Sequence, residues 1–245
     1  GVAVPARSLQ AEAAVSTPQL SGIIPALNEA GCIRVLCTAL QPLRRRGHEV
    51  ILVDGGSEDS TVELGRPLVD MVLSTARGRA TQARAGATVA SGTILWFLHA
   101  DSGVPENPDQ LILEALENGH TDWGRFDVSL ADEHPVLKTV SHLMNLRSWI
   151  TGIATGDQGI FIRRSLYDQV GGIRPLPLME DIALSRDLKK HCRPARIRQQ
   201  LLTSARRWQK HGITRTILTM WGLRLAYFIG VSPRYLAKYY AVNRA

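Results

Sequence analysis

Short apolar runs alternate with helical patterns through the first half of the chain, and this alternation restricts the fold more than any other feature. Residues 49–53 form a nearly continuous apolar run, which is typical of a parallel strand covered on both faces. Further strands are predicted at 20–25, 70–73 and 93–98, and helices at 29–46 and 80–90. This order predicts βαβ units with right-handed crossovers, in one mostly parallel sheet.

Pro25, Asp54 and Asp101 each stand at the carboxyl end of a predicted strand. Ligands of such sheets bind beyond these ends, so three separate segments indicate one crevice. Asp54 precedes two glycines, an arrangement that lets a carboxylate meet a nucleoside while the backbone approaches closely. The alternative is an ordinary turn in which Asp54 caps the next helix. Neither a dinucleotide fingerprint nor a Walker motif is present.

Two carboxylate sites suit catalysis. Asp101 follows a buried strand and is a good ligand for Mg²⁺ or Mn²⁺, with His99 pointing the same way two residues earlier; a simple turn is the alternative. Glu180 and Asp181 open a predicted helix after a proline-rich loop. Acids in a first turn favour the helix dipole, yet an adjacent pair also suits a general base supported by its neighbour.

The second half is less regular and shows no repeat or linker. Its predicted elements lie at 123–130, 135–150, 158–163, 180–191 and 196–204. The simplest organisation has three parts: a disordered or added tail at 1–18, one α/β domain at 19–212, and an apolar helical extension at 213–245. The tail has no long apolar core and no basic start, so a secretory signal is not expected.

Charge favours an anionic partner. Lys and Arg number 29 against 22 acids, which suits a phosphate-bearing ligand, an anionic membrane or nucleic acid. The stretch from Arg186 to Arg215 holds ten of these cations and one acid, and contains Arg206-Arg207-Trp208. Nucleic acid is not expected, because aromatic residues make up only 6% and no RNA- or DNA-binding motif occurs. Three scattered cysteines indicate a reducing compartment, hence a cytoplasmic protein.

The most apolar stretch runs over residues 216–231 and is shorter than the roughly 20 residues that span a bilayer. Burial against the domain is favoured. A second interpretation is peripheral contact with the inner face of the membrane, helped by Trp221, Tyr227 and the flanking Arg215 and Arg234. Pairing of two subunits in a homodimer is a third.

Taken together, these segments resemble the family 2 glycosyltransferases of the GT-A fold. The similar motifs are Ile-Pro-Ala-Leu-Asn-Glu at 24–29, the nucleoside-binding turn at 53–61, the helix at 78–87, the metal motif at 99–101 and the acceptor-side motif at 179–181. The resemblance covers about residues 20–210. The runs at 155–159, 177–181 and 203–208 are also similar to a small bacterial subgroup, the arsenosugar-biosynthesis glycosyltransferases.

The resemblance implies a GT-A fold with helices flanking the sheet, and an inverting sugar transfer from a nucleotide-diphosphate donor, with a UDP-sugar favoured, to a hydroxyl of a small-molecule or lipid acceptor. It implies Asp181 as the general base, with Glu180 orienting the loop or the acceptor. Mg²⁺ or Mn²⁺ would be held by Asp101 with His211. The implied donor-site residues are Pro25, Ala26, Asn28, Glu29, Asp54, Gly56, Arg79, Ala100, Asp101, Gly156, Asp157, Arg207 and Trp208.

Two positions depart from the family pattern. His99 replaces the first Asp of the Asp-X-Asp metal motif, and Ser204 replaces the Gln of the Gln-X-X-Arg-Trp motif of processive members. The second departure argues against a polymer-extruding synthase. The first keeps an alternative function open: a catalytically silent module of the same fold that binds a nucleotide or another anion.

Overall fold

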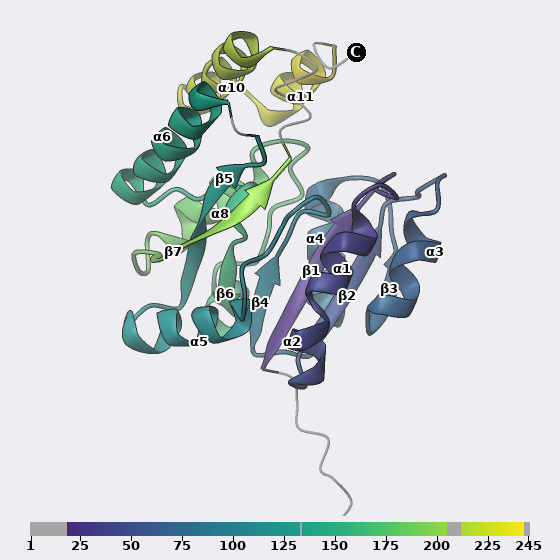
Figure 1. The fold of residues 1–245 in the computed structure, drawn as a ribbon. Coiled ribbons are helices and arrows are strands. Elements are labelled where there is room, and N and C mark those ends of the chain that lie inside the picture. Colours follow the sequence, from purple (N-terminus) through teal and green to yellow (C-terminus); the bar gives the residue numbers. More distant parts are fainter. Residues whose placement is uncertain (1–18, 133, 205–211, 243–245) are drawn as a thin grey trace, which may run out of the picture.

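The computed structural model describes residues 19–132, 134–204 and 212–242. A seven-stranded sheet runs through it in the order β3-β2-β1-β4-β6-β5-β7 (Figure 1). The strands are β1 (Leu20–Ala26), β2 (Glu49–Asp54), β3 (Met71–Ser74), β4 (Ile94–Phe97), β5 (Trp123–Leu130), β6 (Phe161–Arg163) and β7 (Ala195–Thr203). β1 to β4 are mutually parallel, β6 is antiparallel to β4 and β5, and β7 is parallel to β5. The predicted mostly parallel α/β sheet is confirmed.

Helices cover both faces of the sheet. They are α1 (Ile33–Ala39), α2 (Gln41–Arg45), α3 (Thr61–Gly65), α4 (Arg79–Val89), α5 (Pro108–Asn118), α6 (Pro135–Thr151), α7 (Arg164–Gln169), α8 (Glu180–Leu188), α10 (Ile213–Phe228) and α11 (Pro233–Val242), with 3₁₀ turns η1 (Arg66–Leu68) and η2 (Gly156–Gln158). One buried core joins the sheet to α1, α2 and α5, and a second joins it to α4, α7 and α8. Both faces of the central strands are therefore dry, which explains their continuous apolar sequences.

The helix predicted over residues 29–46 is wrong in two respects. Residues 29–32 form a turn, and the helical part begins at Ile33. It then breaks between α1 and α2 at Leu40, two residues before Pro42. Pro42 lacks the N–H group that would donate to the carbonyl four residues earlier, so the first helix ends and α2 starts with this proline in its first turn.

Two other differences concern the second half. The strand predicted at 158–163 begins only at Phe161, because η2 occupies the preceding residues and Gly159 adopts a left-handed backbone with φ of 57°. Helices α5 and α7 were not predicted. The predicted strand at 123–130 and the start of the helix at residue 180 are confirmed.

The C-terminal helices α10 and α11 pack beside the loop that precedes α8. Leu223 and Leu236 share a small buried cluster with Ile153, Met179 and Ile182. In Figure 1 these two helices lie with α6 at one end of the molecule. Within the described ranges, no helix is both long and apolar enough to cross a membrane.

Candidate functional site

A cavity of about 630 Å³ opens where β1 and β4 end, and it extends to the start of α8 and the flank of α10. Eight of the predicted site residues line it: Pro25, Ala26, Glu29, Arg79, Gly156, Asp157, Glu180 and Asp181. Five others do not: Asn28, Asp54, Gly56, Ala100 and Asp101. Arg207, Trp208 and His211 lie outside the described residues. The structure thus brings the nucleotide-side and acceptor-side motifs to one hollow.

The loop after β1 is tied to the loop after β2. The N–H of Asn28 donates to Ser57 Oγ at 3.0 Å, and Asn28 Oδ1 accepts from the N–H of Glu58 at 2.9 Å. Asn28 adopts a left-handed backbone with φ of 55°, which Asn tolerates better than most residues. Next to it, the N–H of Glu29 donates to Thr61 Oγ1 at 2.7 Å. Asn28 therefore fixes the position of this wall without lining the cavity.

The Asp54 side chain is turned towards its own turn. Its carboxylate is buried and accepts from the N–H groups of Gly56, at 3.0 Å, and Ser57, at 3.1 Å. It caps this turn rather than the helix that follows, whose first N–H group, at Thr61, donates to Asp59 at 3.0 Å. Contact between Asp54 and a nucleoside stays a prediction.

Sequence reasoning missed Gln82, which holds the floor of the cavity together. Its buried Nε2 donates to the carbonyl of Ala26 at 2.7 Å and to that of Val53 at 2.8 Å, so it joins the carboxyl ends of β1 and β2. A Cβ at Gly55 would approach the Gln82 amide to 3.0 Å, which explains a glycine there. A long polar side chain in an otherwise small-residue helix was the available signal.

Asp181 is held in place by backbone groups from two segments. Its Oδ2 accepts from the N–H of Gly156 at 2.8 Å and its Oδ1 accepts from the N–H of Ile182 at 2.7 Å. A Cβ at Gly156 would come within 2.6 Å of His99 Nε2, so only glycine lets this strap pass between the two side chains. The strap is itself secured to α8, because Ser185 Oγ bonds both the N–H and the carbonyl of Ala154 at 3.1 Å.

Glu180 lies next to Asp181 in a different environment. Burial, reinforced by the neighbouring Asp181 charge, raises the pKa of the Glu180 carboxyl from 4.5 to about 7, and the cation of Arg79 opposes this shift. Titratable groups with strongly shifted pKa values gather at functional sites, where one carboxyl can serve as base and the other as support.

Asp101 fits a divalent cation that shares its ligands with a substrate. It is half-buried just beyond β4, and its carboxylate makes no hydrogen bond or ion pair with the described residues. The described residues hold no cluster of three or more His, Cys, Asp or Glu side chains able to bind a metal. One free carboxylate is enough for Mg²⁺ or Mn²⁺ when phosphate oxygens and water complete the shell.

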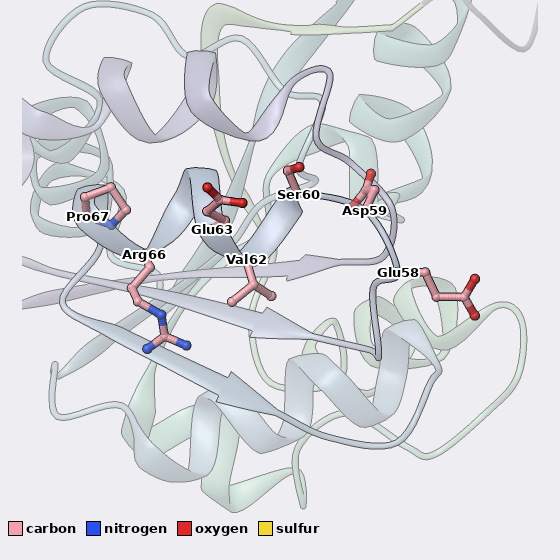
Figure 2. A pocket seen from close by; sticks show the side chains of 7 residues that line it. All are labelled: Glu58, Asp59, Ser60, Val62, Glu63, Arg66 and Pro67. Atoms are coloured by element: carbon pink, nitrogen blue, oxygen red, sulfur yellow. The ribbon is translucent and has the colours of Figure 1, made fainter.

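A second hollow, of about 740 Å³, lies on the outer side of α3 (Figure 2). It is lined by Glu58, Asp59, Ser60, Val62, Glu63, Arg66 and Pro67. Figure 2 shows Glu58 and Arg66 pointing away from one another, and the Asp59 carboxylate already accepts from the N–H of Ala30 at 3.1 Å. Three acids against one cation repel a phosphate-bearing ligand, so the cavity at α8 is the better candidate.

The family model for glycosyl transferase family 2 matches residues 21–171, more than half of the chain. The chain belongs to this family. Curated relatives include undecaprenyl-phosphate 4-deoxy-4-formamido-L-arabinose transferases from Aeromonas hydrophila, 30% identical over 156 residues, and from Yersinia pestis, 27% identical over 157. Each match covers 59% of this chain, and the chain spans about half the length of these relatives, 48%. The predicted family is confirmed, whereas the arsenosugar subgroup stays a prediction.

Solved structures of similar fold support the predicted GT-A class. TarS of S. aureus in complex with UDP-GlcNAc has a TM-score of 0.62 at 18% identity, covering 76% of this chain and 58% of that chain. A mannosyltransferase from Pyrobaculum calidifontis, in complex with GDP-Man and Mn²⁺, has a TM-score of 0.55 at 21% identity, covering 76% and 56%. Glucosyl-3-phosphoglycerate synthase from Mycobacterium tuberculosis has a TM-score of 0.58 at 18% identity, covering 76% and 71%. At 18–21% sequence identity, these structural similarities establish the fold alone.

Several cavity residues had no place in the sequence prediction. Arg77 lines the wall beside Arg79, and α10 and α11 contribute Met220, Leu223, Arg224 and Tyr240. The signal for Arg224 was its isolation as a charge inside the apolar stretch at 216–231. A charged side chain within an apolar helix has to reach either solvent or a polar cavity, and Arg224 lines the cavity.

We expect Glu180→Gln to stabilise the fold in a pH-dependent way. The folded-state pKa of Glu180 is raised, so its ionisation costs stability progressively as pH rises from about 4.5 to about 7, and fully above that. The variant should therefore match the wild type near pH 4.5 and exceed it by about 1–3 kcal/mol at pH 8 in urea unfolding. Glu63→Gln, on the exposed side of α3, is the matched control; an equal gain in both variants, or no pH trend, would contradict the assignment.

Proposed function

We propose that this protein transfers a sugar from a nucleotide-diphosphate donor, with a UDP-sugar favoured, to a hydroxyl group of an acceptor, with inversion at the anomeric carbon. The observation that carries this proposal is the placement of Asp181, whose carboxylate is fixed by two backbone N–H groups in the same cavity as the loop after β1. Family membership supports the same reaction class.

The donor is proposed to bind at the end of the cavity formed by the loops after β1 and before α4. Pro25 and Ala26 would flank the base of the nucleotide. The loop that follows them is already held in place, because its backbone N–H groups donate to the side-chain oxygens of Ser57 and Thr61. Arg77 and Arg79 carry the positive charge at this end and would face the phosphates.

Asp181 is proposed as the general base. It takes the proton of the acceptor hydroxyl while that oxygen forms its bond to the anomeric carbon from the opposite face. The bond between this carbon and the diphosphate oxygen breaks, and the diphosphate leaves with the electron pair. Glu180 supports the orientation of this loop, and at neutral pH its raised pKa keeps a fraction of it uncharged beside the base.

Asp101, with His211 outside the described residues, would hold Mg²⁺ or Mn²⁺, which neutralises charge on the departing diphosphate when bound. Ala100, which precedes Asp101, is buried, and Gly156 and Asp157 line the cavity. Arg207 and Trp208 are proposed to complete the pocket between donor and acceptor.

The acceptor is proposed to be a small molecule or a lipid, reached from the inner face of the cytoplasmic membrane. The relatives are named for the acceptor undecaprenyl phosphate. On α10, Leu218, Trp221, Leu225 and Phe228 recur at helical spacing and are each more than half exposed. No Asp or Glu follows Asp187 in the sequence, so this end of the molecule is cationic as well as apolar. Both properties favour an anionic bilayer surface.

Asp181→Asn should lower turnover by about 10²–10⁴ while donor binding is retained, since the amide keeps the size of the side chain and loses only the proton acceptor. The measurement is release of nucleoside diphosphate from a UDP-sugar with acceptor mixtures, alongside titration of UDP. Glu63→Gln serves as the variant control. Normal turnover in Asp181→Asn would remove the base from its role, and no turnover by the wild type would favour the silent binding module.

Asp101→Ala should abolish the metal dependence of nucleotide binding. Calorimetric titration of UDP, GDP and dTDP, each with and without Mn²⁺, should show metal-enhanced binding of one nucleotide by the wild type only. The nucleotide that binds names the donor base. Equal binding with and without Mn²⁺ in the wild type would contradict the role of Asp101.

Replacing Trp221 and Leu225 together by Ser should weaken binding to vesicles that contain phosphatidylglycerol by about tenfold or more, because both side chains are over 60% exposed and apolar. Cosedimentation measures it, with neutral phosphatidylcholine vesicles as the lipid control and Val35→Ser, a 71% exposed side chain on α1, as the protein control. Unchanged vesicle binding together with loss of a dimer in ultracentrifugation would instead assign this face to a homodimer.

A further inference from the structure

The guanidinium of Arg147, on α6, is buried with two donors unused. Its Nε and Nη2 atoms have no hydrogen-bond partner among the described residues. These two nitrogens form one edge of the guanidinium plane, and this edge is the one that grips a carboxylate or phosphate with two parallel bonds. Burying two charged donors without an acceptor costs folding free energy, and a bound ligand that supplies oxygen acceptors would offset this cost.

Other arginines of this protein use the same edge for an oxyanion. Arg46 donates from Nε and Nη2 to Asp109 at 2.6 and 2.5 Å. Arg196 donates from the same two atoms to Asp127 at 3.0 and 2.7 Å. Arg147 differs from these residues because no described carboxylate occupies its edge.

Arg147 does not itself line the cavity, but three charged residues near it do. Burial, and next the charge of Arg224, lower the pKa of Arg147 to about 10, while Asp157 and Asp181 oppose this shift. Met144 of α6 and Ile217 of α10 pack against one buried cluster, and Arg147 follows one turn beyond Met144.

The two acids nearby do not use the two cations. No ion pair joins Arg147 or Arg224 to Asp157 or Asp181 in the described part of the chain. Asp181 is already satisfied by its two backbone N–H donors, whereas Asp157 Oδ1 is buried without a partner. The unused donors of Arg147 are therefore available to an oxyanion that enters the cavity, while the two carboxylates limit the negative charge that the site tolerates.

We propose that Arg147 and Arg224 bind a phosphate group carried by the acceptor, close to the acceptor oxygen that attacks the anomeric carbon. This inference rests on the proposed function and assigns its acceptor to the phosphate-bearing class. The donor diphosphate is the poorer occupant, because Arg77 and Arg79 already provide cations at the proposed nucleotide end, whereas the charged neighbours of Arg147 are Arg224, Asp157 and Asp181. Asp157 and Asp181 reduce the positive potential that Arg147 and Arg224 create, so the site favours a single phosphate over a more highly charged diphosphate.

The test compares binding of farnesyl phosphate, glycerol phosphate and farnesol in the presence of UDP. The wild type should bind at least one phosphate compound and should bind farnesyl phosphate more tightly than farnesol. Arg147→Gln should weaken phosphate binding by about tenfold to a hundredfold, since it removes a charge-assisted bidentate contact. Arg34→Gln, at an exposed position on α1, is the control and should change phosphate binding less than twofold.

Two further variants keep the test decisive. Arg147→Lys retains the charge and loses the two-donor edge, so an intermediate loss is expected. If Arg147→Gln fails to fold, Arg224→Gln on the cavity wall decides in its place. If farnesyl phosphate binds and glycerol phosphate does not, the acceptor is a lipid phosphate. If glycerol phosphate binds equally well, the acceptor is a small phosphate ester. Either outcome supports the site.

Three outcomes overturn the proposal. Phosphate binding by the wild type at the strength of farnesol, or phosphate binding unchanged in Arg147→Gln and Arg224→Gln, would show that these cations serve no acceptor phosphate. Loss of UDP binding in parallel with phosphate binding would assign the cations to the donor. Failure of the proposed function itself looks different, because the wild type would then bind no nucleotide.

Discussion

Gln82 makes the contact on which one wall of the cavity depends. Its buried amide donates to carbonyls on two neighbouring strands, at Ala26 and Val53, at the point where their loops begin. The hydrogen bonds from the N–H groups of Asn28 and Glu29 to Ser57 and Thr61 then fix the loop after β1 against the segment that follows β2. A binding surface prepared in this way loses little entropy when a ligand arrives.

The part of the cavity around Asp181 is held by a comparable arrangement. The strap through Gly156 lies against His99 and is anchored to α8 through Ser185, so a backbone N–H from a second segment holds the carboxylate. Glu180 is buried beside it with a raised pKa. The carboxyl whose ionisation costs stability therefore lies next to the carboxyl that we propose as the general base.

The pattern of apolar residues along the sequence predicted most of the strands, but it missed some helices and one helix boundary. The apolar run at β2 predicted a buried parallel strand, because burial on both faces leaves a plain mark in sequence. Helix α5 went unpredicted although Pro108 opens it and Ile112 and Leu116 give it an apolar face. The single helix expected over 29–46 is divided at Pro42, because proline cannot donate the backbone hydrogen bond that would continue it.

The sequence by itself determined the family, the order of most of the strands, and the motifs that supply Asp181 and the β1 and β2 loops, because each depends on residues close together in the chain. Only the tertiary structure decided that Asp54 faces its own turn, that Gln82 joins two strands, and that α10 lines the cavity with Arg224. The packing of α6 and α10 against one buried cluster joins segments that are distant in the chain, so no local spacing predicts it.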